Sequence, residues 1–179
     1  PLSEEIDLTG WSIKQKTSDI NNLVSDEFLI NKLIPANGYF LIVNKQVDKY
    51  TGQISSDTTF NSESYSLVNN QALILYDNFG REIDRVGWGE ERIVDGDCET
   101  DCLNNLDNNK SWERKANENS TVDTMESGID KLAGNSYDSD NNLNDFIVRN
   151  NPDPQNSQSL TEPREDEVDD LSDIGDGFK

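Results

Sequence analysis

The chain has 179 residues, of which 36 are acidic and 15 basic, so its formal net charge is -21. Such a charge repels phosphate backbones and anionic lipid headgroups, which argues against nucleic acid and membrane surfaces as partners. Hydrophobic residues make up only 32%, the mean hydropathy is -0.80 and no run reaches the ~18 apolar residues of a membrane span, so we expect one domain with no membrane insertion and some unpacked length.

The first part of the chain contains short apolar runs separated by turn residues. These runs are Ile6–Ile13, Phe28–Ile34 and Tyr39–Val43, and their length is typical of strands. The apolar side chains of the first run change face at Gly10, so a bulge or a corner is expected there. This part of the chain is therefore predicted to consist of strands.

The clearest local signal is a hairpin in the middle of the chain. Ala72–Tyr76 and Glu82–Trp88 are rich in strand formers, and the turn sequence Asp77–Gly80 separates them. Pro35–Gly38 has similar turn chemistry between two apolar runs, because a residue of fixed φ precedes two that tolerate positive φ. We expect both turns to join neighbouring strands.

The second half of the chain is dominated by loops. Residues 89–110 and 116–145 are rich in Asp, Asn and Gly, which is typical of surface loops. Strands are expected at Ser111–Lys115 and Phe146–Arg149, and Asp123–Ala133 is expected to form a short helix or turn. The fold class that follows is all-β with long acidic loops.

The C-terminal end differs in composition from the body. Pro152 and Pro154 end the last predicted strand, and Leu160–Lys179 holds eight acids against two bases. We therefore expect a single domain at residues 1–157 and a disordered acidic tail or linker at residues 158–179.

Five stretches, in order, resemble the lamin-tail domain family. They are Asp7–Ile13, Ile34–Val43, Ala72–Asp77, Ser111–Arg114 and Asn151–Asn156. The resemblance implies an immunoglobulin-like β-sandwich of two packed sheets. Because the chain has no heptad repeats, it resembles the bacterial exported members rather than the nuclear lamins, which implies an extracellular or cell-surface location.

One departure from the family lies at the front of the chain. Family members usually begin with one or two strands before the stretch that corresponds to Asp7–Ile13, and those strands are missing here. The resemblance then implies a sheet with unpaired backbone groups at an edge. We expect such an edge to aggregate or to pair with an added strand peptide.

The sequence offers little catalytic chemistry. It has no histidine, which removes the commonest general base and every Ser-His or Cys-His pair, so we expect no enzyme activity. Cys98 and Cys102 are too few for a structural zinc site. A short-range disulfide is the favoured interpretation, with free thiols and a redox role as alternatives.

Asp138, Asp140 and Asn142 place oxygen atoms at alternate positions, as calcium loops do. An EF-hand starting at Asp138 is excluded, because its sixth and twelfth places hold Leu143 and Arg149 instead of glycine and glutamate. The alternative, which we favour, is a solvated loop with Asx turns. No other cofactor is expected.

The function expected from the sequence is a non-catalytic extracellular or cell-surface module for binding, adhesion or display, whose partner is a protein or a polysaccharide. One alternative is a calcium-dependent binder of carbohydrate or protein, and another is an accessory domain of an extracellular hydrolase or nuclease. Trp11, Trp88 and Trp112 could form a sugar platform, but each lies in a strand-like run, so core packing is favoured.

Overall fold

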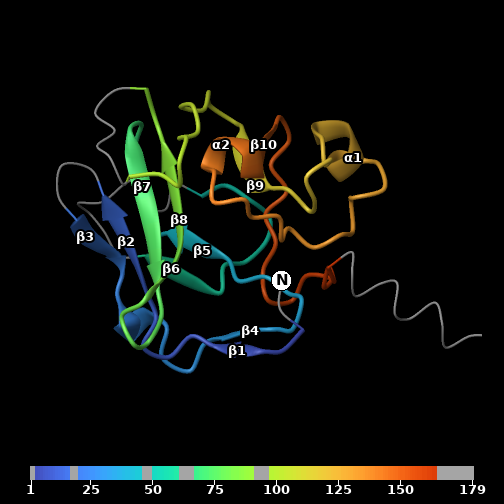
Figure 1. Ribbon diagram of the computed structural model, residues 1–179. Helices are drawn as coiled ribbons and strands as arrows, with labels where there is room; N and C mark the ends of the chain where they lie inside the picture. Colours follow the sequence, from blue (N-terminus) through green and yellow to red (C-terminus); the bar gives the residue numbers. More distant parts are fainter. Residues whose placement is uncertain (1–2, 17–19, 46–49, 61–66, 91–96, 165–179) are drawn as a thin grey trace, which may run out of the picture.

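The computed structural model describes residues 3–16, 20–45, 50–60, 67–90 and 97–164, which form mainly β-strands with short helices (Figure 1). The strands are β1 (Ile6–Asp7), β2 (Ser12–Lys16), β3 (Ile20–Val24), β4 (Leu33–Ile34), β5 (Ile42–Asn44), β6 (Thr58–Phe60), β7 (Gln71–Tyr76), β8 (Glu82–Trp88), β9 (Ser111–Arg114) and β10 (Phe146–Arg149). A single 3-10 turn, η1 (Asp26–Phe28), and two short helices, α1 (Val122–Glu126) and α2 (Asn142–Asp145), complete the described elements. The all-β prediction is confirmed at this level.

The largest sheet has four antiparallel strands in the order β3-β2-β7-β8 (Figure 1). The predicted hairpin is confirmed as β7 and β8, which pair from Gln71 with Trp88 to Tyr76 with Glu82. Its turn is stabilised by Asp77, whose carboxylate accepts the backbone N–H groups of Phe79 and Arg81 at 2.9 and 2.8 Å. The local turn chemistry therefore fixes the register of the sheet.

The remaining strands form three separate pairs. β1 pairs with β4 and β9 with β10 in antiparallel fashion, whereas β5 and β6 are parallel. β9 packs against β8, since the rings of Trp112 and Trp88 lie 5.2 Å apart and Arg114 forms a 2.8 Å ion pair with Asp84. Trp112 and Arg114 are two residues apart and so share the face of β9 that looks toward β8.

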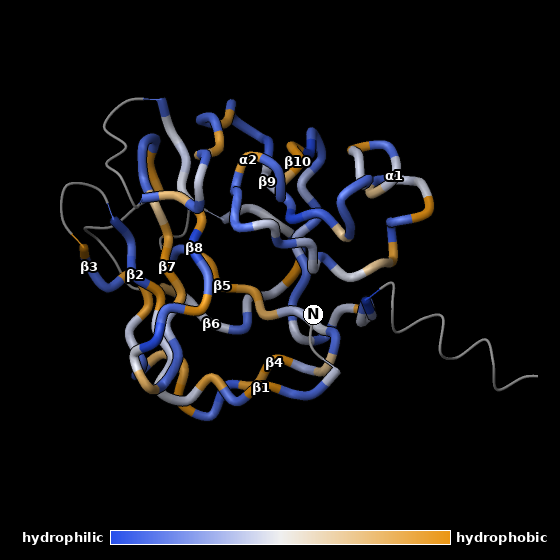
Figure 2. The backbone as a smooth tube through the Cα atoms, viewed as in Figure 1, coloured by the Kyte–Doolittle hydropathy of each residue, from blue (hydrophilic) through white to orange (hydrophobic). Residues whose placement is uncertain are grey.

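The main hydrophobic core lies beside the four-stranded sheet. Figure 2 shows apolar segments gathered along β2, β5 and β7, with polar segments on the outer loops. The buried cluster consists of Leu8, Leu23, Val24, Leu29 and Phe60. Trp11 packs against this cluster and Trp88 is buried, so two of the three tryptophans support the core rather than a surface platform.

One prediction about the early apolar runs is confirmed and another was wrong. The run Ile6–Ile13 is split at Gly10, which has a φ of 84° and turns the chain between β1 and β2, as the change of face predicted. The prediction of one strand over Phe28–Ile34 was wrong. The backbone N–H of Leu29 donates to the Asp26 carbonyl and that of Lys32 to the Leu29 carbonyl, so the chain forms successive turns and only Leu33–Ile34 is a strand. A buried turn places Leu29 in the core instead.

The chain beyond residue 157 still contacts the body as far as it is described. The backbone N–H of Glu162 donates to Asn37 at 2.8 Å, and Pro163 accepts a 2.8 Å bond from Gly134. Residues 165–179, the most acidic part of the expected tail, lie outside the described residues. Within the described chain, neither short helix has the length or apolarity to cross a membrane.

Candidate functional site

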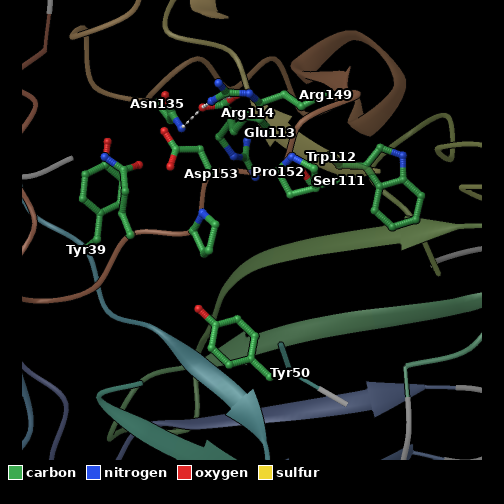
Figure 3. Close-up of a pocket in the computed structure, with 12 residues that line it drawn as sticks. Tyr39, Tyr50, Ser111, Trp112, Glu113, Arg114, Asn135, Arg149, Pro152 and Asp153 are labelled. Atoms are coloured by element: carbon green, nitrogen blue, oxygen red, sulfur yellow. Dashed lines mark hydrogen bonds and ion pairs between the residues drawn. The ribbon is translucent and has the colours of Figure 1, made fainter. Parts of the chain in front are cut away.

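An open groove of about 400 Å³ runs along strand β9 (Figure 3). All four residues of the strand, Ser111–Arg114, line it. Side chains on a strand alternate between its two faces, so a groove that touches four consecutive residues meets the edge of the strand. Among the described residues β9 pairs with β10 alone, and its second edge has no neighbouring strand.

The walls of the groove are rings held in place by hydrogen bonds. Figure 3 shows Tyr50 across the groove from Pro152 and Asp153, with Tyr39 at one end. The Tyr50 hydroxyl donates to the carbonyl of Ile54 at 2.9 Å, and the Tyr39 hydroxyl donates to Glu162. Burial and the Glu162 carboxylate raise the pKa of Tyr39 far above its ordinary value, so its phenol stays neutral. Rings and prolines of this kind suit a binding surface.

The charged side chains at the groove are mostly paired. Glu113 forms a 2.9 Å ion pair with Arg149 and accepts from Asn135 at 3.3 Å. Burial raises the pKa of Glu113, and the Arg149 charge opposes that rise. Asp153 differs, because it is exposed and makes no ion pair with a described residue. The net unpaired charge that the groove offers a ligand is therefore negative.

Two further cavities adjoin this groove. Tyr50 also lines a cavity of about 310 Å³ beside Leu41–Asn44, the residues of strand β5 and the one before it. Arg114 and Asn135 also line a cavity of about 420 Å³, whose apolar wall comes from Ile6, Ile34, Leu75 and Ile83. The groove therefore shares Tyr50 with one of these cavities and Arg114 and Asn135 with the other.

A network of carboxylates surrounds Arg114 where β9 meets β8. The guanidinium donates to both oxygens of Asp84 at 2.8 Å and lies 3.4 Å from Asp138 and 4.0 Å from Asp145. The same guanidinium sits over the Phe146 ring, 4.7 Å from its centroid. Arg114 is thus the positively charged residue in a cluster that is otherwise acidic.

Glu99 completes the acidic cluster, because its carboxylate and those of Asp138 and Asp145 lie within 4.8 Å of one another. Burial, together with the charges of Asp84 and Asp138, raises the pKa of Glu99 to about 7, against a partial offset from Arg114. A carboxyl group with this pKa exchanges its proton near neutral pH. Protonation of Glu99 therefore removes part of the excess negative charge of this acidic cluster.

The structure places the predicted calcium residues in different roles. Asp138 belongs to the acidic cluster, but Asp140 does not, and its backbone N–H donates to the Asp138 carboxylate at 3.2 Å as in an Asx turn. The side-chain oxygen of Asn142 accepts from the Gly87 backbone at 2.8 Å and from that of Glu99 at 3.3 Å. Calcium needs six to eight oxygen ligands, and the oxygen of Asn142 is committed to backbone donors. Calcium binding here stays a prediction.

The predicted disulfide positions Glu99. Cys98 and Cys102 are joined, with their Cα atoms 5.2 Å apart. The backbone N–H groups of Asn142 and Leu143 donate to the backbone carbonyls of Glu99 and Asp101 at 3.0 and 3.1 Å, respectively. These bonds hold the disulfide loop against α2. Sequence reasoning identified Asp138 but not Glu99, Arg114 or Asp145, because these residues converge only through the fold.

We expect Glu99→Gln to change how stability depends on pH. A carboxyl group whose pKa rises on folding holds its proton more tightly in the folded chain, so stability falls as the pH rises from 4.5 to about 7. Glutamine keeps the oxygen that accepts from Asn142 but cannot ionise. Melting temperatures of the wild type and the variant should match near about pH 5 and diverge toward about pH 8, with the variant more stable. A constant difference across this range would contradict the assigned pKa.

Comparison of the chain with known proteins found no match. No protein-family model matches it, no curated protein is similar to it, and no solved structure matches its fold. The lamin-tail resemblance of the five motifs therefore stays a prediction.

Proposed function

We propose that this chain is a non-catalytic binding module that acts outside the cell or on the cell surface, and that the groove beside β9 is its binding surface. The observation that carries the proposal is the exposed edge of β9, lined along all of Ser111–Arg114. An unpaired strand edge offers backbone donors and acceptors to a partner. The absence of histidine from the sequence supports a role in binding rather than catalysis.

A protein segment is the partner class that this surface favours. Backbone groups along an edge strand match a second backbone, whereas a sugar would be recognised mainly by side chains and rings. In the groove the side chains of Glu113 and Arg149 are paired with each other, so fewer of them are free to bind hydroxyl groups. Binding of a polysaccharide is the competing outcome of the test.

We further propose that the fold is the immunoglobulin-like sandwich of the lamin-tail type. Support comes from the order of the five motifs, from the β-rich fold, and from the packing of β9 across β8 through Trp112 and Trp88. In such a fold one sheet would contain β3-β2-β7-β8 and the other would contain β5, β6, β9 and β10.

The binding proposal is tested by selecting random peptides on the immobilised chain. Peptides that bind the wild type should bind Asp153→Arg about tenfold more weakly, because Asp153 is exposed in the groove. Asp107→Arg is the matched control, because Asp107 is exposed and lies outside the groove lining. Recovered peptides should keep their mass after incubation.

Three results would contradict the proposal: no enrichment of peptides, equal loss of binding in both variants, or cleavage of bound peptides. An immobilised set of oligosaccharides serves as the parallel arm. Binding there that Asp153→Arg weakens and Asp107→Arg leaves unchanged would assign the groove to polysaccharide instead.

A further inference from the structure

The backbone groups of β9 point alternately toward β10 and toward the opposite edge. In an antiparallel pair, a residue hydrogen-bonded to the neighbouring strand is followed by one whose N–H and C=O point away from that strand. The backbone N–H of Lys115 donates to the Asp145 carbonyl at 2.8 Å and so continues the register of β9 with β10. The backbone of Glu113 therefore also faces β10, whereas the backbones of Trp112 and Arg114 face the opposite edge.

The outward edge of β9 is held in a fixed conformation but has no strand beside it. Within the described parts of the chain, the backbone N–H and C=O groups of Trp112 and Arg114 have no hydrogen-bond partner. Their side chains are held on the face toward β8, where Trp112 packs on Trp88 and Arg114 pairs with Asp84. The edge therefore presents two donors and two acceptors from a strand that its own side chains already fix in place.

We propose that an extended segment of a partner protein, carrying lysine or arginine, adds to this edge as a further strand and hydrogen-bonds to the backbones of Trp112 and Arg114. The inference rests on the proposed function, because it specifies how the partner binds in the groove beside β9. A third strand would extend the two-stranded sheet of β9 and β10, and it would satisfy the outward backbone groups.

The lining of the groove favours basic residues in the added segment. Asp153 is exposed and makes no ion pair with a described residue, whereas Glu113 and Arg149 are paired with each other. Tyr50 lines the same groove, and an aromatic ring packs well against the apolar stem of a lysine or an arginine. The net charge of -21 attracts a basic segment and disfavours a second copy of the chain as the occupant.

The first test is a scan of backbone N-methylation in the tightest-binding peptide from the selection on the immobilised chain. A series of fluorescent peptides carries one N-methyl group each, and affinity is measured by fluorescence anisotropy. Because only every second residue of an added strand faces β9, affinity should fall about tenfold at alternate positions over a stretch of about four residues. The positions between them are the internal control.

The second test measures amide hydrogen exchange residue by residue with nuclear magnetic resonance. Binding of the same peptide should slow exchange most at Trp112 and Arg114, whose N–H groups gain a partner. Exchange at Glu113 should change less, because its N–H already faces β10.

The third test concerns the charge of the segment. Replacing the basic residues of the peptide by norleucine should weaken binding to the wild type about tenfold. The same replacement should have a smaller effect on Asp153→Asn, because that variant lacks the exposed carboxylate of the groove. Asp107→Asn, which changes an exposed acid outside the groove lining, should behave as the wild type does.

The outcomes separate this inference from the proposed function. A uniform N-methylation profile, with binding that still depends on Asp153, would overturn strand addition while the binding module remained supported. Exchange that slows at Glu113 but not at Trp112 or Arg114 would overturn it as well. An equal effect of norleucine on the wild type and Asp153→Asn would overturn the assigned charge of the partner. Failure to enrich any peptide would overturn both the inference and the proposed function.

Discussion

Replacing Asn142 by alanine is expected to lower the free energy of unfolding by about 3 kcal/mol or more. The side chain is fully buried, and its oxygen accepts the backbone N–H groups of Gly87 and Glu99. Its amide donates to the Arg85 carbonyl at 2.9 Å and to the Glu99 carboxylate at 2.7 Å. Alanine would leave several buried polar groups without partners and detach the disulfide loop from β8.

Urea unfolding followed by circular dichroism measures this loss. Asn144→Ala is the matched control, because Asn144 is exposed on the same short helix and should change stability by about 0.5 kcal/mol or less. If Asn142→Ala were no more destabilising than Asn144→Ala, the side chain of Asn142 would not be the clamp between α2, β8 and the disulfide loop.

Replacing Arg114 by glutamine is expected to lower the free energy of unfolding by about 3 to 5 kcal/mol, because it removes the cation from a partly buried cluster of acids. The Arg114 side chain is only 14% exposed and pairs with Asp84 and Asp138 at 2.8 and 3.4 Å. Without it these carboxylates, together with Glu99, would face one another with no compensating charge. The loss should shrink at acidic pH, where the carboxyl groups are protonated.

Thermal unfolding of Arg114→Gln across a range of pH tests this expectation. Lys110→Gln is the matched control, because it removes one positive charge from an exposed ion pair with Asp107 just before β9. Arg114→Lys should lie between wild type and Arg114→Gln, since it keeps the charge but not the two-pronged contact with Asp84. Equal stability of Arg114→Gln and Lys110→Gln would contradict the role of Arg114.

The parts of the fold that the sequence predicted well are those encoded locally. The β7–β8 hairpin followed from the turn at Asp77–Gly80, and β9 and β10 followed from short interruptions of the Asp- and Asn-rich loops. β3 and β6 were missed for different reasons. β3 contains Asn21 and Asn22, which are disfavoured in strands, and β6 has only three residues, which is too short for a pattern. The run at Phe28–Ile34 was wrongly predicted to be a strand, because a short apolar run in the sequence can belong either to a strand or to a buried turn.

The candidate site was predicted less completely for the same reason. Asp138 was identified from local oxygen spacing, and Cys98 with Cys102 from their close positions. The convergence of Asp138 with Glu99 and Arg114 depends on the packing of three separate segments, which no local pattern encodes. The groove is also non-local, because Tyr39, Tyr50 and β9 line it from distant parts of the chain.

Amide hydrogen exchange of the chain, with and without a peptide selected on the immobilised chain, tests most directly whether the edge of β9 is a binding surface. We predict that the peptide slows exchange along Ser111–Arg114, because a strand added at the open edge of β9 hydrogen-bonds to that edge. Unchanged exchange along Ser111–Arg114, with the peptide demonstrably bound, would contradict binding at the edge of β9.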